Sequence, residues 1–359
     1  MDFNPKLIQL SEKWKAFHND PTPGQIMTTI CPYTYDLDYS AFGIAPRPLS
    51  SWNFETDAKE FVLRQKKMHD IFMEHTKDLD NDYFPALNVN LGYGVNSAYV
   101  TGLPVTFGED TSWVHHLIED WDEDMPKLRL DENNYWYRKV LEMTKMFVDM
   151  QNGDYAVSGF PNAGPGDMAN AIRGNEIFTD LYDEPERVFE LMAFCVGAAQ
   201  WLEDGIRGVA GDVNGGTVSA NCWFEGLAPY ISLDFNDLCS PQVFREFDFK
   251  TTQMLLDIYK GAYIHHHMKG YHIHADVAKL KHLKMLEISW DPGLPKPVSL
   301  LPEILEMHNG LPLMVRCTAQ DVYEYIDDLK KGRVVIMLNI NNLDEGREVM
   351  KFIRKNSII

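Results

Sequence analysis

The chain has 359 residues, a hydrophobic fraction of 45% and a formal net charge of −20. This length and apolar content predict a folded protein with a large core and exclude a disordered one. The acidic balance repels phosphate backbones and anionic lipids, so we expect neither nucleic acid nor a membrane as partner. No apolar run approaches the roughly 20 residues that span a bilayer.

The first residues lack the basic segment and apolar core of a secretory signal. The five cysteines are odd in number and widely spaced, without a C-x-x-C pair: Cys31, Cys195, Cys222, Cys239 and Cys317. This pattern is typical of free thiols in a reducing compartment. We therefore expect a cytoplasmic protein without disulfides.

The N-terminal half is expected to be mainly helical. Residues 1–80 are predicted to form a mostly helical extension, and long helices are expected near 56–78, 134–151 and 185–206. Short apolar runs between them predict strands at 84–90 and 155–160. No Gly/Ser linker divides the chain, so residues 1–359 are expected to form one domain.

The C-terminal half alternates between strand and helix. Apolar runs predict strands at 217–222, 262–267, 285–290, 312–317 and 333–340, and helices are expected at 240–260, 298–310, 319–332 and 343–354. Continuous apolar strands are typical of a parallel sheet that is buried on both faces. The number of units favours an α/β fold that forms a single (β/α)8 TIM barrel with N-terminal helical additions. No G-x-G-x-x-G supports the nucleotide-binding alternative.

A barrel places chemistry at the carboxyl ends of its strands. The predicted strand ends and the loops that follow them carry polar and aromatic residues. We predict that substrate is bound by Asn88, Asn90, Tyr93, Phe160, Asn221, Trp223, Lys269, Trp290 and Arg316.

Residues 262–270 read A-Y-I-H-H-H-M-K-G, and this stretch with the loop after it holds half of the twelve histidines. Side chains alternate along a strand, so His265 and His267 share one face and His266 lies on the other. The functional interpretation is a metal or acid/base site, because imidazole is a common zinc ligand. The alternative is that individual histidines are packed and hydrogen-bonded. The spacing matches no closed structural zinc motif.

Three residues are predicted to bind the metal: His265, His267 and Cys317, whose thiolate would be a soft ligand. His267, Asp234 and Asp291 are predicted to be catalytic. The segment F-P-N-A-G-P-G-D-M-A-N at 160–170 carries a helix-start signature. A helix N-terminus there would favour an anionic ligand group, although an ordinary turn is equally compatible with these residues.

Three segments resemble the uroporphyrinogen decarboxylase superfamily. The first is F-P-N-A-G-P-G-D-M-A-N-A-I-R-G-N-E-I-F-T-D-L-Y-D-E-P-E-R-V, which is similar to the central glycine/proline loop and helix of that superfamily. The second is I-S-L-D-F-N-D-L-C-S-P-Q-V-F-R-E-F, and the third is Y-I-H-H-H-M-K-G, with His267 and Gly270 in the motif positions. The three segments follow one another in the same order as in the superfamily, between residues 160 and 270, and the resemblance is taken to cover roughly residues 80–340. The resemblance implies a (β/α)8 barrel, in agreement with the alternation of elements.

The superfamily includes porphyrinogen decarboxylases and zinc-dependent methyltransferases that work with corrinoid proteins. The decarboxylases carry M-R-Q-A-G-R-Y near the N-terminus, where this chain reads A-P-R-P-L-S-S-W. The methyltransferases use H-x-C and a later cysteine to bind zinc. Here His265 is followed by His266 and His267, so only Cys317 could match, as the later cysteine. The resemblance therefore disfavours porphyrinogen decarboxylation and implies a variant metal site.

The function expected first is a metal-dependent methyltransferase or demethylase. It would act on a small polar or methoxylated substrate, with zinc as the metal and a corrinoid carried by a partner protein. One alternative is a metal-free decarboxylase or lyase of a small carboxylic acid, in which His267 is the general acid and Lys269 or Arg316 holds the carboxylate. The other is a ligand-binding relative without catalysis. A homodimer is compatible with the resemblance.

Overall fold

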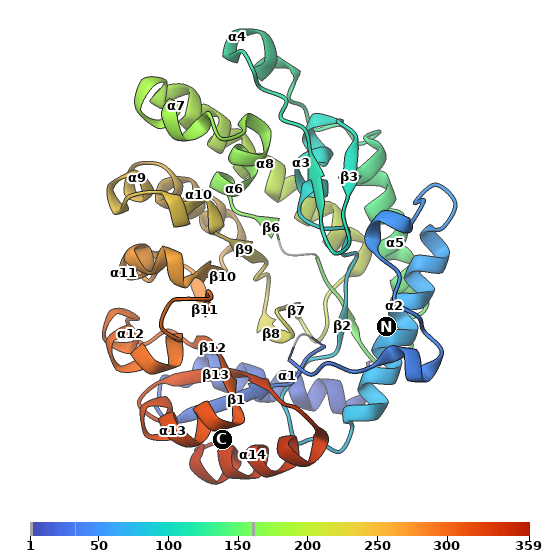
Figure 1. The fold of residues 1–359 in the computed structure, drawn as a ribbon, viewed down its shortest axis with the longest axis vertical. Coiled ribbons are helices and arrows are strands. Elements are labelled where there is room, and N and C mark those ends of the chain that lie inside the picture. Colours follow the sequence, from blue (N-terminus) through green and yellow to red (C-terminus); the bar gives the residue numbers. More distant parts are fainter. Residues whose placement is uncertain (1–2, 33, 160–161) are drawn as a thin grey trace.

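The structure is a computed structural model that describes residues 3–32, 34–159 and 162–359. Its centre is a seven-stranded parallel sheet in the order β1-β13-β12-β11-β10-β9-β6, and helices surround the strands (Figure 1). The expected α/β class with a parallel sheet is confirmed. The strands are β1 (Gln25–Thr29), β6 (Asn162–Ala163), β9 (Tyr230–Ser232), β10 (Ala262–His267), β11 (Leu283–Ser289), β12 (Leu313–Thr318) and β13 (Arg333–Asn339).

Closure of the sheet into a TIM barrel is not confirmed. Strands β2 (Ala86–Leu87) and β5 (Ala156–Val157) pair in parallel with each other, but among the described residues no ladder joins them to the seven-stranded sheet. Asp82, which precedes β2, partly bridges the gap to β1. Thr28 N–H donates to Asp82 Oδ2 (2.8 Å) and Asp82 N–H donates to the Thr28 carbonyl (2.6 Å).

The helices of the C-terminal half follow the predicted alternation, with one break. The helix expected at 240–260 is two helices, because Phe247 leaves helical geometry at φ −117° and ψ −79°. The helices here are α8 (Pro185–Ala210), α9 (Pro241–Glu246), α10 (Asp248–Tyr259), α11 (His274–Val277), α12 (Leu301–Met307), α13 (Ala319–Leu329) and α14 (Leu343–Asn356). Three 3-10 turns follow strand ends or precede a helix: η4 (Asp234–Leu238), η5 (Met268–Ile273) and η6 (Pro297–Leu300).

The N-terminal half is helical as expected but also supplies a strand of the main sheet. Strand β1 was not predicted, because its sequence Q-I-M-T-T lies within the region expected to be helical. Further helices are α1 (Pro5–Asn19), α2 (Ala58–Thr76), α3 (Gly94–Thr101), α4 (Trp121–Asp124), α5 (Tyr135–Asp149), α6 (Pro165–Arg173) and α7 (Ile177–Asp183), and β3 (Val105–Phe107) pairs antiparallel with β4 (Ser112–Val114).

The run at 217–222 is not a strand of the parallel sheet. It forms an antiparallel hairpin, β7 (Gly216–Ser219) with β8 (Cys222–Glu225), and Ala220 and Asn221 make the turn at φ of 48° and 57°. The hairpin packs against α1, just before β1, and the Asn221 carbonyl accepts the Phe84 N–H (2.9 Å), just before β2. The hairpin therefore lies at the amino ends of the strands.

Two apolar clusters hold these elements together. One is centred on strands β10 to β13, whose apolar side chains are nearly inaccessible, and it includes Trp14 and Trp223. The other lies among α2, α5, α6 and α8 and includes Met143 and Phe147. Within the described ranges, no helix combines the length and apolarity needed to cross a bilayer.

Candidate metal centre

Strand β10 places His265 and His267 at the carboxyl end of the parallel sheet. His265 pairs in register with Ser232 of β9 and with Glu287 of β11, and His267 pairs with Ser289. The pleat alternation puts both imidazoles on one face of β10. His265 is buried and His267 is half-buried.

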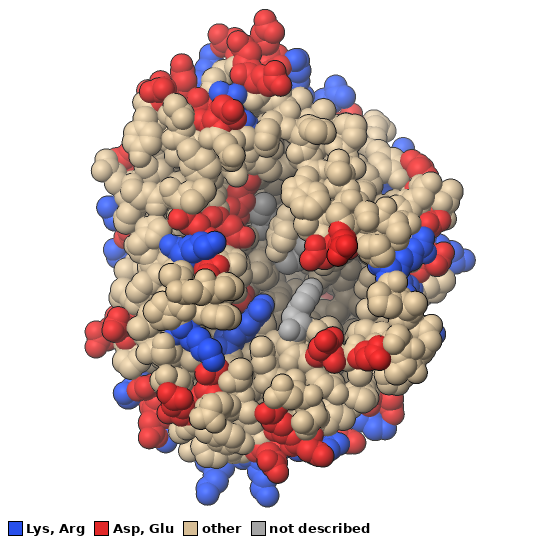
Figure 2. Space-filling model, in the orientation of Figure 1, with Lys and Arg blue, Asp and Glu red and all other residues tan. Residues whose placement is uncertain are grey.

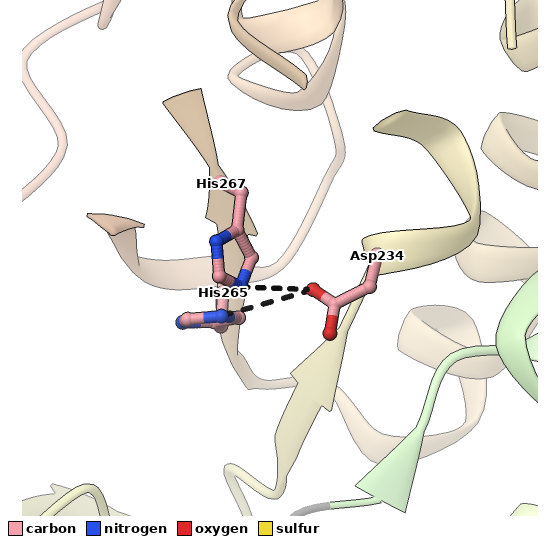
Figure 3. A group of neighbouring side chains, drawn as sticks. All are labelled: Asp234, His265 and His267. Carbon is pink, nitrogen blue, oxygen red and sulfur yellow. Dashed lines mark ion pairs between the residues drawn. The ribbon is translucent and has the colours of Figure 1, made fainter. Parts of the chain in front are cut away.

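Asp234 completes a group of three side chains with these histidines (Figure 3). It begins η4, two residues after Ser232, and therefore reaches the level of the histidine side chains. Its Oδ1 lies 3.7 Å from His265 Nε2 and also 3.7 Å from His267 Nε2. These separations are too long for N–H···O hydrogen bonds, which measure about 2.7–3.2 Å.

The other ring nitrogen of each histidine bonds to a carboxylate. His265 Nδ1 lies 2.9 Å from Glu287 Oε2, and His267 Nδ1 lies 3.0 Å from Asp291 Oδ1. An ionised carboxylate only accepts, so each Nδ1 carries the hydrogen and donates it. In the neutral imidazoles both Nε2 lone pairs consequently face Asp234. Carboxylates behind the histidines are typical of metal-ligating imidazoles.

Glu287 is a buried anion that is fully supplied with donors. Besides His265, it accepts hydrogen bonds from the Tyr263 hydroxyl and from Ser289 Oγ (2.9 Å). Burial opposes its ionisation, but the charge and hydrogen bond of His265 and the two hydroxyls outweigh burial and lower the pKa of Glu287 to about 2. For His265, burial disfavours the cation, yet Glu287 and then Asp234 raise its pKa above the ordinary value.

Asp291 connects the second histidine to the loop that follows β10. Its Oδ1 accepts from His267, and its Oδ2 accepts the main-chain N–H of Lys269 at 3.0 Å. Asp291 is buried, so neither bond is exposed to much competing water. The carboxylate thereby fixes both the imidazole plane and the path of η5.

Asp234 is positioned by hydrogen bonds between its main chain and α6. The Asp167 carboxylate accepts the main-chain N–H of Asp234 (3.3 Å) and that of Phe235. A Cβ on Gly164 would lie 2.3 Å from the Ser232 carbonyl oxygen, so a glycine is needed for α6 to approach β9 this closely.

At the start of α6 the sequence was compatible with either an anionic ligand group or an ordinary turn. The structure puts the protein's own carboxylate there instead: Asp248 Oδ1 accepts the Gly166 N–H at 3.1 Å, and Asp248 also accepts from the Asn236 side chain. A Cβ on Gly166 would lie 2.9 Å from Asp248 Oδ2. This segment is therefore built to place η4, which carries Asp234.

The group of three has the spacing and chemistry of a metal site. Ligand atoms about 2.1 Å from a tetrahedral ion lie roughly 3.4 Å apart, close to the two observed separations of 3.7 Å. Two imidazoles and one carboxylate suit zinc and other divalent first-row metals. Three protein ligands leave positions for water or substrate, as in catalytic sites rather than closed structural ones.

His266, His272 and His274 are hydrogen-bonded outside the group of three, as the alternative interpretation of these histidines predicts. His266 faces away from Asp234, His265 and His267, which are called the metal group below. It belongs to a buried chain of hydrogen bonds that runs from His266 to His274 (2.9 Å) and from His274 to His308 (3.2 Å). Burial lowers the pKa of His266 and of His308 to about 4. His272 bonds to the carbonyls of Lys269 and Cys239.

The predicted ligand Cys317 does not join the group. No described residue other than Asp234, His265 and His267 belongs to that cluster of ligand atoms. Cys317 lies on β12, two strands from β10, and follows Arg316 on the opposite face of the strand. Burial raises the pKa of its thiol, and its charged neighbours are Asp321 and Lys296 on the helix side. The structure does not bring Cys317 to the group, because the alternation of side chains along β12 turns its thiol to the other face of the strand.

Asn221 and Trp223 also lie elsewhere, in the β7–β8 hairpin at the amino ends of the strands. Trp223 is buried, and its Nε1–H donates to the Val213 carbonyl at 2.8 Å. The premise that these two residues end a parallel strand was wrong, because an antiparallel hairpin also reads as a short apolar run.

Other predicted residues do reach the carboxyl ends of strands. Lys269 and Arg316 are exposed, and Trp290 is 43% exposed with its Nε1–H bonded to the Leu294 carbonyl. Figure 2 shows a hollow near the centre of the visible face, with acidic and basic side chains along its border. That Lys269, Arg316 and Trp290 contact substrate stays a prediction.

Three predicted residues follow β2, on the other side of the sheet gap. Asn90 Oδ1 accepts the Gly92 N–H (3.0 Å), as in a turn, Asn88 is partly buried, and Tyr93 is 47% exposed. No hydrogen bond or ion pair found among the described residues joins them to the metal group. Phe160 lies outside the described residues.

Sequence reasoning missed Glu287 and Asp167. Glu287 interrupts the apolar strand M-L-E-I-S-W, and an acidic residue inside a buried strand is a signal that could have been used. Asp167 follows the G-P-G motif and was treated as part of a helix start. Its contact with η4 joins segments 67 residues apart, which no local pattern reveals.

Comparison with known proteins supports the fold. No family profile matches the chain, and no curated protein matches its sequence. A solved structure, a methyltransferase from Methanosarcina mazei, is similar over 99% of both chains with a TM-score of 0.63 and 14% sequence identity. At that identity the likeness establishes a shared fold, and the resemblance to the uroporphyrinogen decarboxylase superfamily stays a prediction.

Proposed function

We propose that Asp234, His265 and His267 bind a divalent metal, with zinc as the first candidate, and that the protein is a metal-dependent methyltransferase. One observation carries the proposal: both Nε2 atoms lie 3.7 Å from the same Asp234 oxygen while both Nδ1 atoms are held by carboxylates. This arrangement leaves three lone-pair donors converging on one point. A cation satisfies all three.

When bound, the metal would supply Lewis acidity that stabilises negative charge on a substrate heteroatom. The substrate would be a small polar or methoxylated molecule. Its heteroatom–methyl bond breaks, the electron pair stays on the heteroatom, and the methyl group passes to a corrinoid carried by a partner protein. The fold shared with a methyltransferase supports this choice of reaction.

The chain's own residues would orient and support this chemistry. Glu287 and Asp291 keep the two Nδ1 atoms protonated, so that the Nε2 atoms face the metal. Asp167 fixes the main chain that carries Asp234. Asp291, through its bond to the Lys269 N–H, also sets the course of the loop beside the site.

Elemental analysis of untagged protein tests the metal site. We expect about one zinc per chain in the wild type and in Cys317→Ala, and little in Asp234→Ala or His267→Ala. Cys317→Ala is the matched control, because this thiol lies on the face of the sheet opposite to the one that carries His265 and His267. Metal-free wild type purified without chelators, or metal loss in Cys317→Ala, contradicts the proposed site.

Methyl transfer is tested separately with free cob(I)alamin as the acceptor. Zinc-loaded protein is incubated with a panel of small methoxylated compounds, and methylcobalamin is followed by its absorbance. We expect turnover that Asp234→Ala abolishes. Turnover that persists in Asp234→Ala would show that methyl transfer does not depend on this site.

A metal-free decarboxylase or lyase is the second candidate. Two features favour it: Arg316, which has no ion-pair partner among the described residues and can hold a carboxylate, and the hydrogen-bonded pair His267–Asp291, which can donate a proton. Decarboxylation of small carboxylic acids by chelator-treated protein would select this reaction over methyl transfer.

A further inference from the structure

The strongest unassigned feature near the metal group is the guanidinium of Arg316. Arg316 belongs to β12, whose partner β11 pairs Glu287 with Met314 and Ile288 with Val315. The next step of this register brings Arg316 level with Ser289, which pairs with His267 on β10. Arg316 therefore lies in the same layer as His267, roughly 10 Å away across two strand spacings.

The side chain of Arg316 lies on the same face of the sheet as His265 and His267, not on the face that Cys317 takes. It has the same pleat parity as Met314, whose sulfur contacts the buried Tyr263 hydroxyl, which in turn bonds to Glu287. Its positive charge is also among the influences that act on the pKa of His265. Cys317, one residue on, takes the helix-facing side.

Arg316 is exposed and, within the described ranges, has no carboxylate at ion-pair distance. Two other cations in this half of the chain do have carboxylate partners: Lys296 pairs with Asp321 at 2.8 Å, and Arg245 pairs with Asp276 at 2.7 Å. A guanidinium that lacks such a partner among the described residues can bind an external anion.

The second cation nearby is Lys269, which is exposed and likewise has no carboxylate at ion-pair distance among the described residues. The two cations differ in the geometry of their donors. Arg316 presents planar, bidentate donors that match a carboxylate, which an ammonium does not.

The proposed metal ligands also restrict the class of substrate. With Cys317 excluded, the donor set is two imidazoles and one carboxylate, without a thiolate. Sites of nitrogen and oxygen ligands suit oxygen-donor substrates better than all-thiolate sites do. The open positions of the metal and the free guanidinium thus select for two different groups on one small molecule.

We propose that the substrate is a small oxygen-donor acid, such as a hydroxy or alkoxy carboxylate, with its oxygen on the metal and its carboxylate on Arg316. This inference rests on the proposed metal site and deepens it by naming the class of ligand. The net charge of −20 would otherwise repel such an anion, so binding requires the metal and the guanidinium together.

Cobalt-substituted protein tests the inference, with glycolate as the probe and glycolamide as its neutral counterpart. Binding is followed by the visible absorption of Co(II). We expect Arg316→Gln to weaken glycolate binding roughly 10- to 100-fold, to leave glycolamide binding unchanged and to leave Co(II) affinity unchanged. Arg245→Gln, the same change at an ion-paired arginine, should behave as wild type.

The outcomes separate the two proposals. Wild-type protein that takes up no Co(II) overturns the metal site, and the inference with it. Protein that binds Co(II) but holds glycolate equally well with Arg316→Gln overturns the inference alone. The same is true if glycolamide binds as tightly as glycolate, or if Lys269→Gln weakens glycolate and Arg316→Gln does not.

Discussion

The two ends of the central sheet use the same residue types for different purposes. At the amino ends, His18 bonds to the Trp223 carbonyl and stacks on Phe224, and Trp223 fills the core. At the carboxyl ends, His265 and His267 have carboxylates on one side and a shared carboxylate oxygen on the other. The difference lies in the partners: a carbonyl and aromatic rings surround the packed histidine, whereas carboxylates surround the two histidines that are candidate metal ligands.

The largest effect on stability is expected at the amino end. Trp223→Ala should lower the free energy of unfolding by about 3–5 kcal/mol, because it removes a buried indole and the hydrogen bond from its Nε1–H to the Val213 carbonyl. Denaturant unfolding measures the loss. Zinc content of the folded fraction should match the wild type, and a loss of zinc from folded Trp223→Ala would show that the two ends are coupled.

The next effect is expected behind the metal group. Glu287→Gln keeps the size of the side chain but removes the anion that accepts the His265 hydrogen, so zinc affinity should fall roughly 10- to 100-fold. Competition with a chromophoric chelator gives the affinity. Glu225→Gln, at an exposed pair with Lys15 on the hairpin, is the control and should leave affinity intact. If Glu287→Gln binds zinc as tightly as the wild type, Glu287 does not support the metal site.

A smaller effect is expected at Asp167. Asp167→Asn keeps one acceptor for the main chain of η4 but replaces the other carboxyl oxygen with an amide donor, so zinc affinity should fall about tenfold, equivalent to about 1.4 kcal/mol. Isothermal titration calorimetry with zinc measures it. Asp204→Asn, on α8, provides the matched control. A loss of stability without any change in zinc affinity would limit Asp167 to a structural role.

The smallest effect concerns pH at the amino end. Burial lowers the pKa of His18 to about 3, so the folded protein keeps it neutral while the unfolded chain binds a proton near pH 6.5. Stability from this residue is present above pH 6.5 and is lost as pH falls toward the folded-state pKa, by about 1 kcal/mol between pH 7 and 5.5.

His18→Gln tests this assignment, because it keeps a donor for the Trp223 carbonyl but does not titrate. The variant should lose about 1 kcal/mol less than the wild type over that pH range, as measured by urea unfolding at each pH. Identical pH dependence in the two proteins would mean that His18 is not kept neutral by burial.

The sequence predicts the C-terminal half of the fold well, because each strand there is a long apolar run with a helix after it. Strands β10 to β13 lie within a few residues of their expected bounds. The failures are short or ambiguous runs. β9 has only three residues, β1 lies in a region expected to be helical, and the hairpin β7–β8 has the composition of a parallel strand.

The candidate site was predicted where strand alternation sufficed and missed where contacts are distant. His265 and His267 share a face, as the period of a strand requires, and Asp234 joins them because η4 follows the neighbouring strand directly. Cys317 was misplaced by a single position of the same alternation. Glu287 and Asp167 act through contacts between segments 22 and 67 residues apart, which a linear pattern does not encode.

The most direct test of the metal centre is to locate the ion. Crystals grown with zinc, with diffraction data collected on both sides of the zinc absorption edge, give its position independently of activity. We predict an anomalous peak about 2.0–2.2 Å from Nε2 of His265, Nε2 of His267 and an oxygen of Asp234. A fully occupied peak elsewhere, or no peak at this position at saturating zinc, would contradict the account.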